Sequence, residues 1–287
     1  MAINKNDLLQ RVAAGVIYTL IMGVATLVSW WSTLVVIAVT SGICCYEFLR
    51  MATNEGFKPY KAIGTTIAVL MPLSMAINVD GTHVVAFALA TAFIGGIVCL
   101  CRFFVRTEES IVDVSITIFG YLYVGLTLSS FILLRSRIGG GFEAGLMCLF
   151  VLLSVWMNDA FAYLGGSAFG KHKFAPKISP RKTWEGVICG MFGSMLFWML
   201  IPVVCPSCGF GFVWAAISGL LCGMLGIVGD LTESHIKRSF HTKDSGKLMP
   251  GHGGLLDRSD SLFFVSVVAC FMIIVAPYAF NVIGVTL

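Results

Sequence analysis

The stretch from Gly229 to Ser261 gathers residue types that handle phosphate groups and metal ions. It holds five of the chain's 15 acidic residues and five of its 19 Lys and Arg, although only 12% of the chain is charged. Aspartates are hard oxygen ligands for divalent cations, Lys and Arg pair with phosphates, and glycines allow close backbone approach to a ligand. The residues concerned are Asp230, Asp244, Asp257 and Asp260; Lys237, Arg238, Lys243, Lys247 and Arg258; and Gly251, Gly253 and Gly254. A solvated loop of mixed charge is the alternative, but it does not explain why opposite charges recur at helical spacing.

The spacing predicts that the helix before this stretch continues past Gly229. On a 3.6-residue period Asp230, Ser234, Lys237 and His241 share one face, with Arg238 beside them. A carboxylate and a hydroxyl then lie one turn below two cations, which suits a metal ion with phosphates above it.

Asp257 and Asp260 similarly share a face where the next helix begins. Acids at a helix N-terminus are also ordinary dipole partners, worth roughly 0.3–1 kcal/mol each. That alternative accounts for these two residues but not for Asp230 at the other end of the loop.

A second polar loop, residues 165–183, is rich in cations. It resembles a phosphate-binding P-loop at Gly165, Gly170 and Lys171, but His172 stands where Ser or Thr would bind magnesium, and an apolar helix precedes it. We therefore reject that motif and expect Thr183 to cap the next helix. The cations by themselves could be a topological anchor; because they are expected to face an acidic cluster, we predict that they bind substrate, together with Ser179. They are Lys171, Lys173, Lys177, Arg181 and Lys182.

Two acidic positions interrupt apolar segments. Asn158 and Asp159 break an apolar run near its end, and an ionisable group there is a site candidate because it is costly in a membrane; a polar contact between helices is the alternative. Glu47 lies near the inner end of another apolar segment. We interpret it as a boundary residue that reaches toward the membrane surface, the alternative being a polar member of a cavity.

Composition predicts an all-α integral membrane protein that forms a single polytopic domain over residues 1–287. The chain is 57% hydrophobic and has a mean hydropathy of +0.91. A membrane-spanning helix needs roughly 17–25 apolar residues. Nine segments meet this need: Val12–Val28, Ser32–Leu49, Tyr60–Ile77, Thr82–Cys101, Ile111–Leu134, Phe142–Leu164, Trp184–Val204, Phe210–Gly229 and Leu262–Ile283.

The distribution of positive charge predicts the orientation. With nine spans, the N-terminus and alternate loops lie on one side, and 17 of the 19 Lys and Arg fall there; only Arg135 and Arg137 fall on the other. The positive-inside rule therefore places the N-terminus and the loops 165–183 and 230–261 in the cytoplasm, and the C-terminus outside. The net charge of +4 suits an anionic membrane surface, and no stacking motif indicates nucleic-acid binding.

The long loop also resembles a known family. Ser234-x-Ile236-Lys237-Arg238, then Lys243-Asp244, then His252-Gly253-Gly254-Leu255-x-Asp257-Arg258-x-Asp260 is similar to the signature of the phosphatidate cytidylyltransferases, with mild departures at Met249 and Ser259. The segment Lys177-x-Ser179-Pro180-Arg181-Lys182-Thr183 resembles a second family motif. The resemblance implies that CTP and phosphatidic acid give CDP-diacylglycerol and pyrophosphate at the cell membrane. It also implies a homodimer and a second, monovalent cation.

On this basis we assign roles. Asp230 and Asp257, with Ser234 and Asp244, are expected to hold Mg²⁺, and Asp159 and Asp260 to bind or orient the cations. Lys237, Arg238, Lys243 and Arg258 would pair with phosphates, and the Lys171–Lys182 loop would close over the nucleotide or the lipid head. We count Lys237, Arg238, Asp244 and Asp257 as catalytic. His252 would donate a hydrogen bond to pyrophosphate or shape the turn.

Two alternatives stay open at this point. Intramembrane acids in glycine-rich helices also suit an ion-coupled transporter, and a CTP-dependent lipid kinase would share the membrane and metal requirements. The product separates them, because only the cytidylyltransferase releases pyrophosphate. Cys205 and Cys208 could form a disulfide on the outer side.

Overall fold

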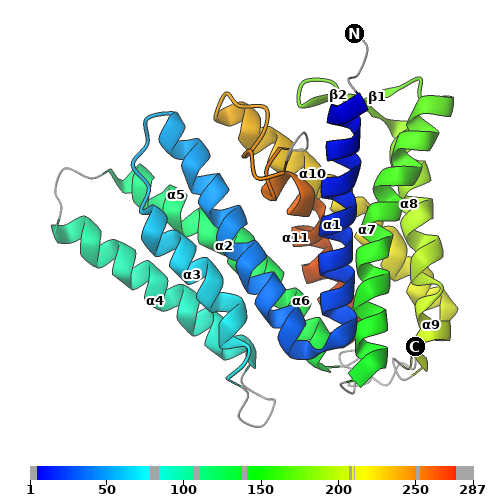
Figure 1. Ribbon diagram of the computed structural model, residues 1–287, viewed down its shortest axis with the longest axis horizontal. Helices are drawn as coiled ribbons and strands as arrows, with labels where there is room; N and C mark the ends of the chain where they lie inside the picture. Colours follow the sequence, from blue (N-terminus) through cyan, green and yellow to red (C-terminus); the bar gives the residue numbers. More distant parts are fainter. Residues whose placement is uncertain are drawn as a thin grey trace. The chain divides into compact units, whose positions relative to one another are not determined.

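The structure is a computed structural model that describes residues 5–77, 84–105, 110–137, 141–206, 209, 211–249 and 253–275. Within these residues the chain forms nine helical segments, if helices that follow one another directly or across the short turn at 199–200 are counted together; the nine membrane spans stay a prediction. The helical segments are α1 (Lys5–Val28), α2 (Trp30–Asn54), α3 (Lys61–Ser74), α4 (Val84–Val105), α5 with η1 and α6 (Ile111–Tyr121, Leu122–Leu126, Thr127–Arg137), α7 (Gly141–Phe169), α8 with α9 (Trp184–Trp198, Ile201–Val204), α10 (Phe212–Ser239) and α11 with η3 (Leu256–Cys270, Phe271–Val275) (Figure 1).

Among the described residues, six helices are long and apolar enough to cross a membrane. They are residues 30–54, 86–105, 111–136, 141–169, 184–204 and 212–239, and the apolar parts of α1 and α3 are shorter. Large apolar side chains on these helices stay exposed, such as Phe93 and Leu89 of α4. An aqueous surface disfavours such a band, whereas lipid tails accept it. The chain is therefore a multi-pass membrane protein.

The chain forms two compact units. The first contains residues 1–25, 31–132 and 236–259. Its helices α3, α4 and α5 lie side by side (Figure 1), and its core includes Leu34 and Ile37 of α2 and Met71 of α3. Gly120 of α5 permits one close approach, because a Cβ there would meet the ring of Phe48 at 2.8 Å.

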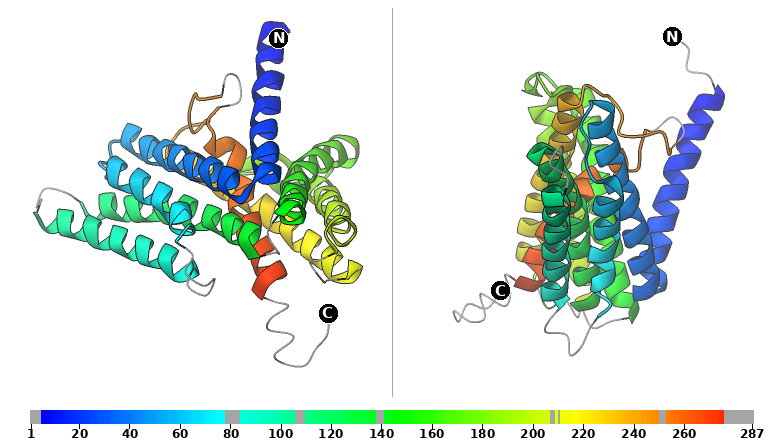
Figure 2. Two further views of the ribbon diagram at one scale, coloured as in Figure 1. Left: turned by 60° about the horizontal axis from the view of Figure 1, so that its bottom comes forward. Right: turned by 90° about the vertical axis from the view of Figure 1, so that its left-hand side faces the viewer.

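The second unit contains residues 26–30, 133–235 and 260–287. Helices α7 and α8 run side by side in it (Figure 2). Glycines let the helices of this unit pack closely: a Cβ at Gly190 would meet Asn158 at 2.8 Å, and one at Gly219 would meet the Met195 Cα at 2.6 Å.

Residues 165–183 differ from the predicted loop. Helix α7 continues through Gly165 to Phe169, and a hairpin of β1 (Lys173–Ala175) and β2 (Ser179–Thr183) follows in antiparallel pairing. The helix continues because Gly165 packs directly on Cys189 of α8, where any side chain would clash. This contact depends on how α7 and α8 pack together. The apolar pattern of the sequence cannot show it, and for that reason the predicted helix ends before the observed one.

Candidate active site

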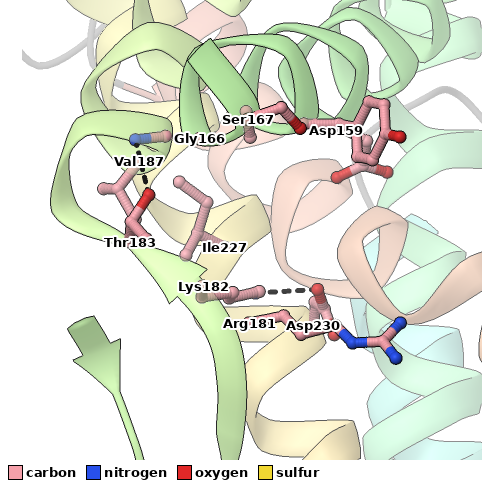
Figure 3. Close-up of a pocket in the computed structure, with 12 residues that line it drawn as sticks. Asp159, Gly166, Ser167, Arg181, Lys182, Thr183, Val187, Ile227 and Asp230 are labelled. Atoms are coloured by element: carbon pink, nitrogen blue, oxygen red, sulfur yellow. Dashed lines mark hydrogen bonds and ion pairs between the residues drawn. The ribbon is translucent and has the colours of Figure 1, made fainter. Parts of the chain in front are cut away.

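A cavity of about 470 Å³ opens in the second unit, where α7, β2, α8 and α10 meet. Its charged wall consists of Asp159 on α7, Arg181 and Lys182 on β2, and Asp230 on α10. Figure 3 shows Lys182 and Asp230 pointing toward one another, with Asp159 and Ser167 on the α7 side. The remaining lining is small or apolar: Ala162, Tyr163, Gly166, Thr183, Gly186, Val187 and Ile227.

Asp230 has a partner on each carboxylate oxygen. Lys182 Nζ lies 2.7 Å from its Oδ2, and Ser234 Oγ donates to Oδ1 at 3.3 Å. The Asp230–Ser234 contact confirms that α10 continues past Gly229 and brings these two side chains together one turn apart. The side chain of Asp230 is 34% exposed and that of Lys182 is 22% exposed, so a ligand in the cavity can reach both.

Local capping holds the strand that carries Arg181 and Lys182. Thr183 Oγ1 accepts a hydrogen bond from the Gly186 backbone N–H at 3.2 Å, which confirms the predicted helix cap. The Trp184 N–H donates to the His172 carbonyl at 3.0 Å and closes the base of the hairpin. Arg181 and Lys182 therefore lie near the end of β2, which these hydrogen bonds hold in place and which α8 follows directly.

The cavity suits a divalent cation that is shared with phosphates. Asp159 and Asp230 present hard oxygen donors to it, and Arg181 and Lys182 present cations. Within the described ranges no three His, Cys, Asp or Glu side chains form a ready ligand cluster. Mg²⁺ is commonly held by one or two carboxylates together with substrate phosphates and water, not by an all-protein cage.

Asp257 forms the centre of a separate cluster in the first unit. Its Oδ1 accepts from Lys237 Nζ at 2.7 Å, and its Oδ2 accepts from Ser245 N at 3.0 Å, Ser245 Oγ at 2.9 Å and Gly254 N at 2.7 Å. The Asp257 side chain is 6% exposed and that of Lys237 is 15% exposed. Gly253 has a φ of +84°, so the turn before the aspartate needs a glycine.

The structure contradicts the interpretation of Glu47 as a residue that reaches toward the membrane surface. Glu47 is 5% exposed, its carboxylate accepts from Leu256 N at 2.8 Å and Leu255 N at 3.2 Å, and the Ser245 hydroxyl that contacts Asp257 also lies 3.2 Å from it. The first backbone N–H groups of a helix have no acceptor within that helix. Glu47 on α2 provides the acceptor for two of them at the start of α11. A lone Glu in an apolar segment was the only sequence signal, and its partners lie about 200 residues further along the chain.

The other candidate residues range from exposed to buried. Of the five cations around the hairpin, Arg181 and Lys182 line the cavity, whereas Lys171, Lys173 and Lys177 are exposed along the hairpin. Ser179 is half-buried at the start of β2. Asp260 is buried and accepts from the Ser261 N–H at 2.7 Å. Arg238, Lys243, Asp244 and Arg258 are exposed.

Two sequence predictions fall outside the described residues. These are the role of His252 and the pairing of Cys208; its suggested partner Cys205 is buried.

Together the apolar helices and the charged cavity define a class: a multi-pass membrane protein with a site suited to phosphates and a divalent cation. The sequence model of the cytidylyltransferase family matches residues 9–276. The chain therefore belongs to the cytidylyltransferase family.

Curated relatives carry a narrower name. A protein of Synechocystis sp. named phosphatidate cytidylyltransferase is 29% identical over 298 residues, covering 95% of this chain and 99% of that protein. Proteins of the same name from Staphylococcus aureus (strain COL) and Staphylococcus epidermidis (strain RP62A) are each 39% identical. Those two matches cover 56% of this chain and 59% of each relative.

Proposed function

We propose that this protein is a phosphatidate cytidylyltransferase, which converts CTP and phosphatidic acid to CDP-diacylglycerol and pyrophosphate. Family membership and the names of the relatives support a CTP-dependent nucleotidyltransferase. The observation that carries the proposal is the cavity bordered by Asp159, Arg181, Lys182 and Asp230, because it pairs acids for a metal ion with cations for phosphates. The transporter and the lipid kinase have no such support.

The reaction needs charge control more than an activated nucleophile. A phosphate monoester has a second pKa near ~6, so the lipid phosphate is already largely a dianion at neutral pH. One of its oxygens bonds to the α-phosphorus of CTP, and the bond from that phosphorus to the bridging oxygen breaks as pyrophosphate leaves. Fixed cations offset the repulsion between the two substrates and stabilise the departing charge. We propose that Lys182 and Arg181 perform this task, because both border the cavity; the phosphate roles of Lys237 and Arg238 stay predictions.

We propose that Asp230, Ser234 and Asp159 hold Mg²⁺, which would neutralise charge on the phosphates of CTP. Lys182 would then turn from Asp230 toward a phosphate oxygen. The metal roles of Asp257, Asp244 and Asp260 stay predictions, as do the phosphate roles of Lys243 and Arg258, a second monovalent cation and a homodimer.

An apolar cavity in the first unit supports a lipid substrate. It has a volume of about 420 Å³ and is walled by α1, α2 and the segment before Asp257, where Leu248, Met249 and Leu255 take part. The α1 and α2 side chains are Ala14, Ile17, Tyr18, Ile21, Met22, Val35, Val36, Val39 and Thr40. We propose that an acyl chain of phosphatidic acid lies there.

We further propose nine membrane spans with a cytoplasmic N-terminus and active site. The distribution of 17 of the 19 Lys and Arg on one side supports this topology. Reporter fusions within 54–60 and 135–142 test it: the first should report the cytoplasm and the second the outside.

The testing experiment uses purified full-length protein with labelled CTP, phosphatidic acid and Mg²⁺, with and without EDTA. We expect pyrophosphate and CDP-diacylglycerol, both lost with EDTA. CDP with a phosphorylated lipid would instead identify a kinase, and no product would contradict the proposal. Asp113→Asn is the matched control for aspartate variants of the site, because that side chain accepts from the Lys58 backbone N–H, far along the sequence from the motifs.

A further inference from the structure

We propose that Glu47 is a positioning residue for the reaction. Its buried carboxylate holds Ser245 and the backbone of Leu255 and Leu256 in place, and through them the Asp257–Lys237 pair. This inference rests on the proposed function, since it assigns Glu47 a part in the same chemistry.

The first observation is a continuous chain of hydrogen bonds. The Ser245 hydroxyl lies 3.2 Å from Glu47 Oε2 and 2.9 Å from Asp257 Oδ2, and Asp257 Oδ1 receives Lys237 Nζ at 2.7 Å. A single residue, Ser245, therefore links Glu47 to Asp257. Its helix α2 gives it a rigid base, because the neighbouring side chains of Phe48 and Leu49 are buried.

The second observation concerns two glycines that border the carboxylate. A Cβ at Gly246 would collide with Glu47, and one at Gly254 would collide with both Glu47 and Ser245. Neither glycine has a positive φ, in contrast to Gly253. Space for the Glu47 side chain is therefore the reason for glycine at 246 and 254, and this loop is shaped around the carboxylate.

The third observation is the match between donors and acceptor. Leu255 N and Leu256 N each present a hydrogen to a different oxygen of Glu47, and the one hydrogen of the Ser245 hydroxyl lies within reach of both Glu47 and Asp257. A carboxylate can accept each of these hydrogens, whereas the amide of Gln turns two hydrogens of its own toward donors. A buried donor left without an acceptor is unfavourable, so the start of α11 would shift and move Asp257.

The first test is Glu47→Gln, with pyrophosphate release as the measurement. We expect kcat to fall about 10- to 100-fold, which is the range for residues that orient a site residue without contacting the substrate themselves. KM for CTP should change less than kcat. Ser41→Ala is the matched control. Ser41 is buried in the same helix but donates to the Ala68 carbonyl, so its loss should leave kcat near that of the wild type.

The second test couples Glu47 to Gly246. Gly246→Ala alone should reduce kcat, because the methyl group displaces the carboxylate. In a Glu47→Ala background the same change should reduce kcat no further, since the methyl group then has room. Independent, multiplying losses would overturn the proposal.

A third measurement does not depend on catalysis. Hydrogen exchange at the Ser245, Leu255 and Leu256 amides should accelerate in Glu47→Gln and not in Ser41→Ala. Unchanged exchange in Glu47→Gln would overturn the positioning role, whatever the activity. The wild-type protein could release no pyrophosphate while the two variants still differ in exchange in this way. That result would refute the proposed function and leave the structural link between Glu47 and Asp257 in place.

Discussion

Asp230 and Asp257 each hold a lysine ammonium at 2.7 Å, yet their surroundings differ. The Asp230 side chain is 34% exposed on a cavity wall, whereas that of Asp257 is 6% exposed and accepts three further hydrogen bonds. An exposed ion pair contributes little to stability and exchanges partners easily, while a buried pair is costly to break. The same two residue types thus provide one pair that a ligand can open and one pair that holds a loop in place.

The largest effect is expected at the buried pair. Asp257→Leu should abolish turnover and destabilise the protein by about 3–5 kcal/mol, because it removes the carboxylate that pairs with the largely buried Lys237 ammonium and accepts three further hydrogen bonds. Thermal unfolding in detergent and pyrophosphate release measure the two effects. The double variant Asp257→Leu/Lys237→Met should regain part of the stability and none of the activity, since an apolar pair can replace a buried ion pair, whereas the Ser245 and Gly254 amides still lack their acceptor. Equal stability of the single and double variants would contradict the distinction between the two aspartates.

Asp230→Asn should separate activity from stability. We expect turnover to fall by about 10²–10³-fold, as for loss of a charge that acts on the reacting phosphates. The unfolding free energy should change by less than about 1 kcal/mol, because the pair is partly exposed. A large fall in melting temperature would show that both aspartates serve the fold. Near-normal turnover would remove Asp230 from the proposed metal site.

Arg181→Lys tests the cavity wall against the rest of its hairpin. Lysine keeps the charge but lacks the planar, two-pronged donor geometry of arginine. We expect KM for CTP to rise about tenfold, the equivalent of about 1.4 kcal/mol. Lys173→Ala, on the exposed partner strand, should leave KM unchanged. Similar effects of both variants would indicate a general electrostatic role for the hairpin.

The smallest effect is expected in the apolar cavity. Val36→Trp should fill part of it and raise KM for long-chain phosphatidic acid a few-fold, a cost comparable to overpacking at about 1 kcal/mol. The effect is small because lipid tails lose little when they remain in the bilayer. KM for CTP should not change. A rise for short-chain and long-chain substrate alike would argue against an acyl site.

Patterns along the chain were sufficient for the helices and for the residue types of the site. Apolar length and the 3.6-residue period are local properties, so they predicted the helical segments and the extension of α10 that places Ser234 against Asp230. The hairpin was missed, because strands of three and five residues carry no clear period. The prediction for Glu47 was wrong because a single Glu near the end of an apolar segment is also typical of a residue at a membrane boundary.

The sequence by itself determined the membrane class, the number of helical segments and the acids and cations available for phosphate chemistry. Tertiary structure alone decided that Arg181 and Lys182 border the cavity while Lys173 does not, and that Glu47 serves a loop about 200 residues away. The physical reason is range: helix periodicity acts over a few residues, whereas burial and hydrogen-bond partners depend on which distant segments pack together.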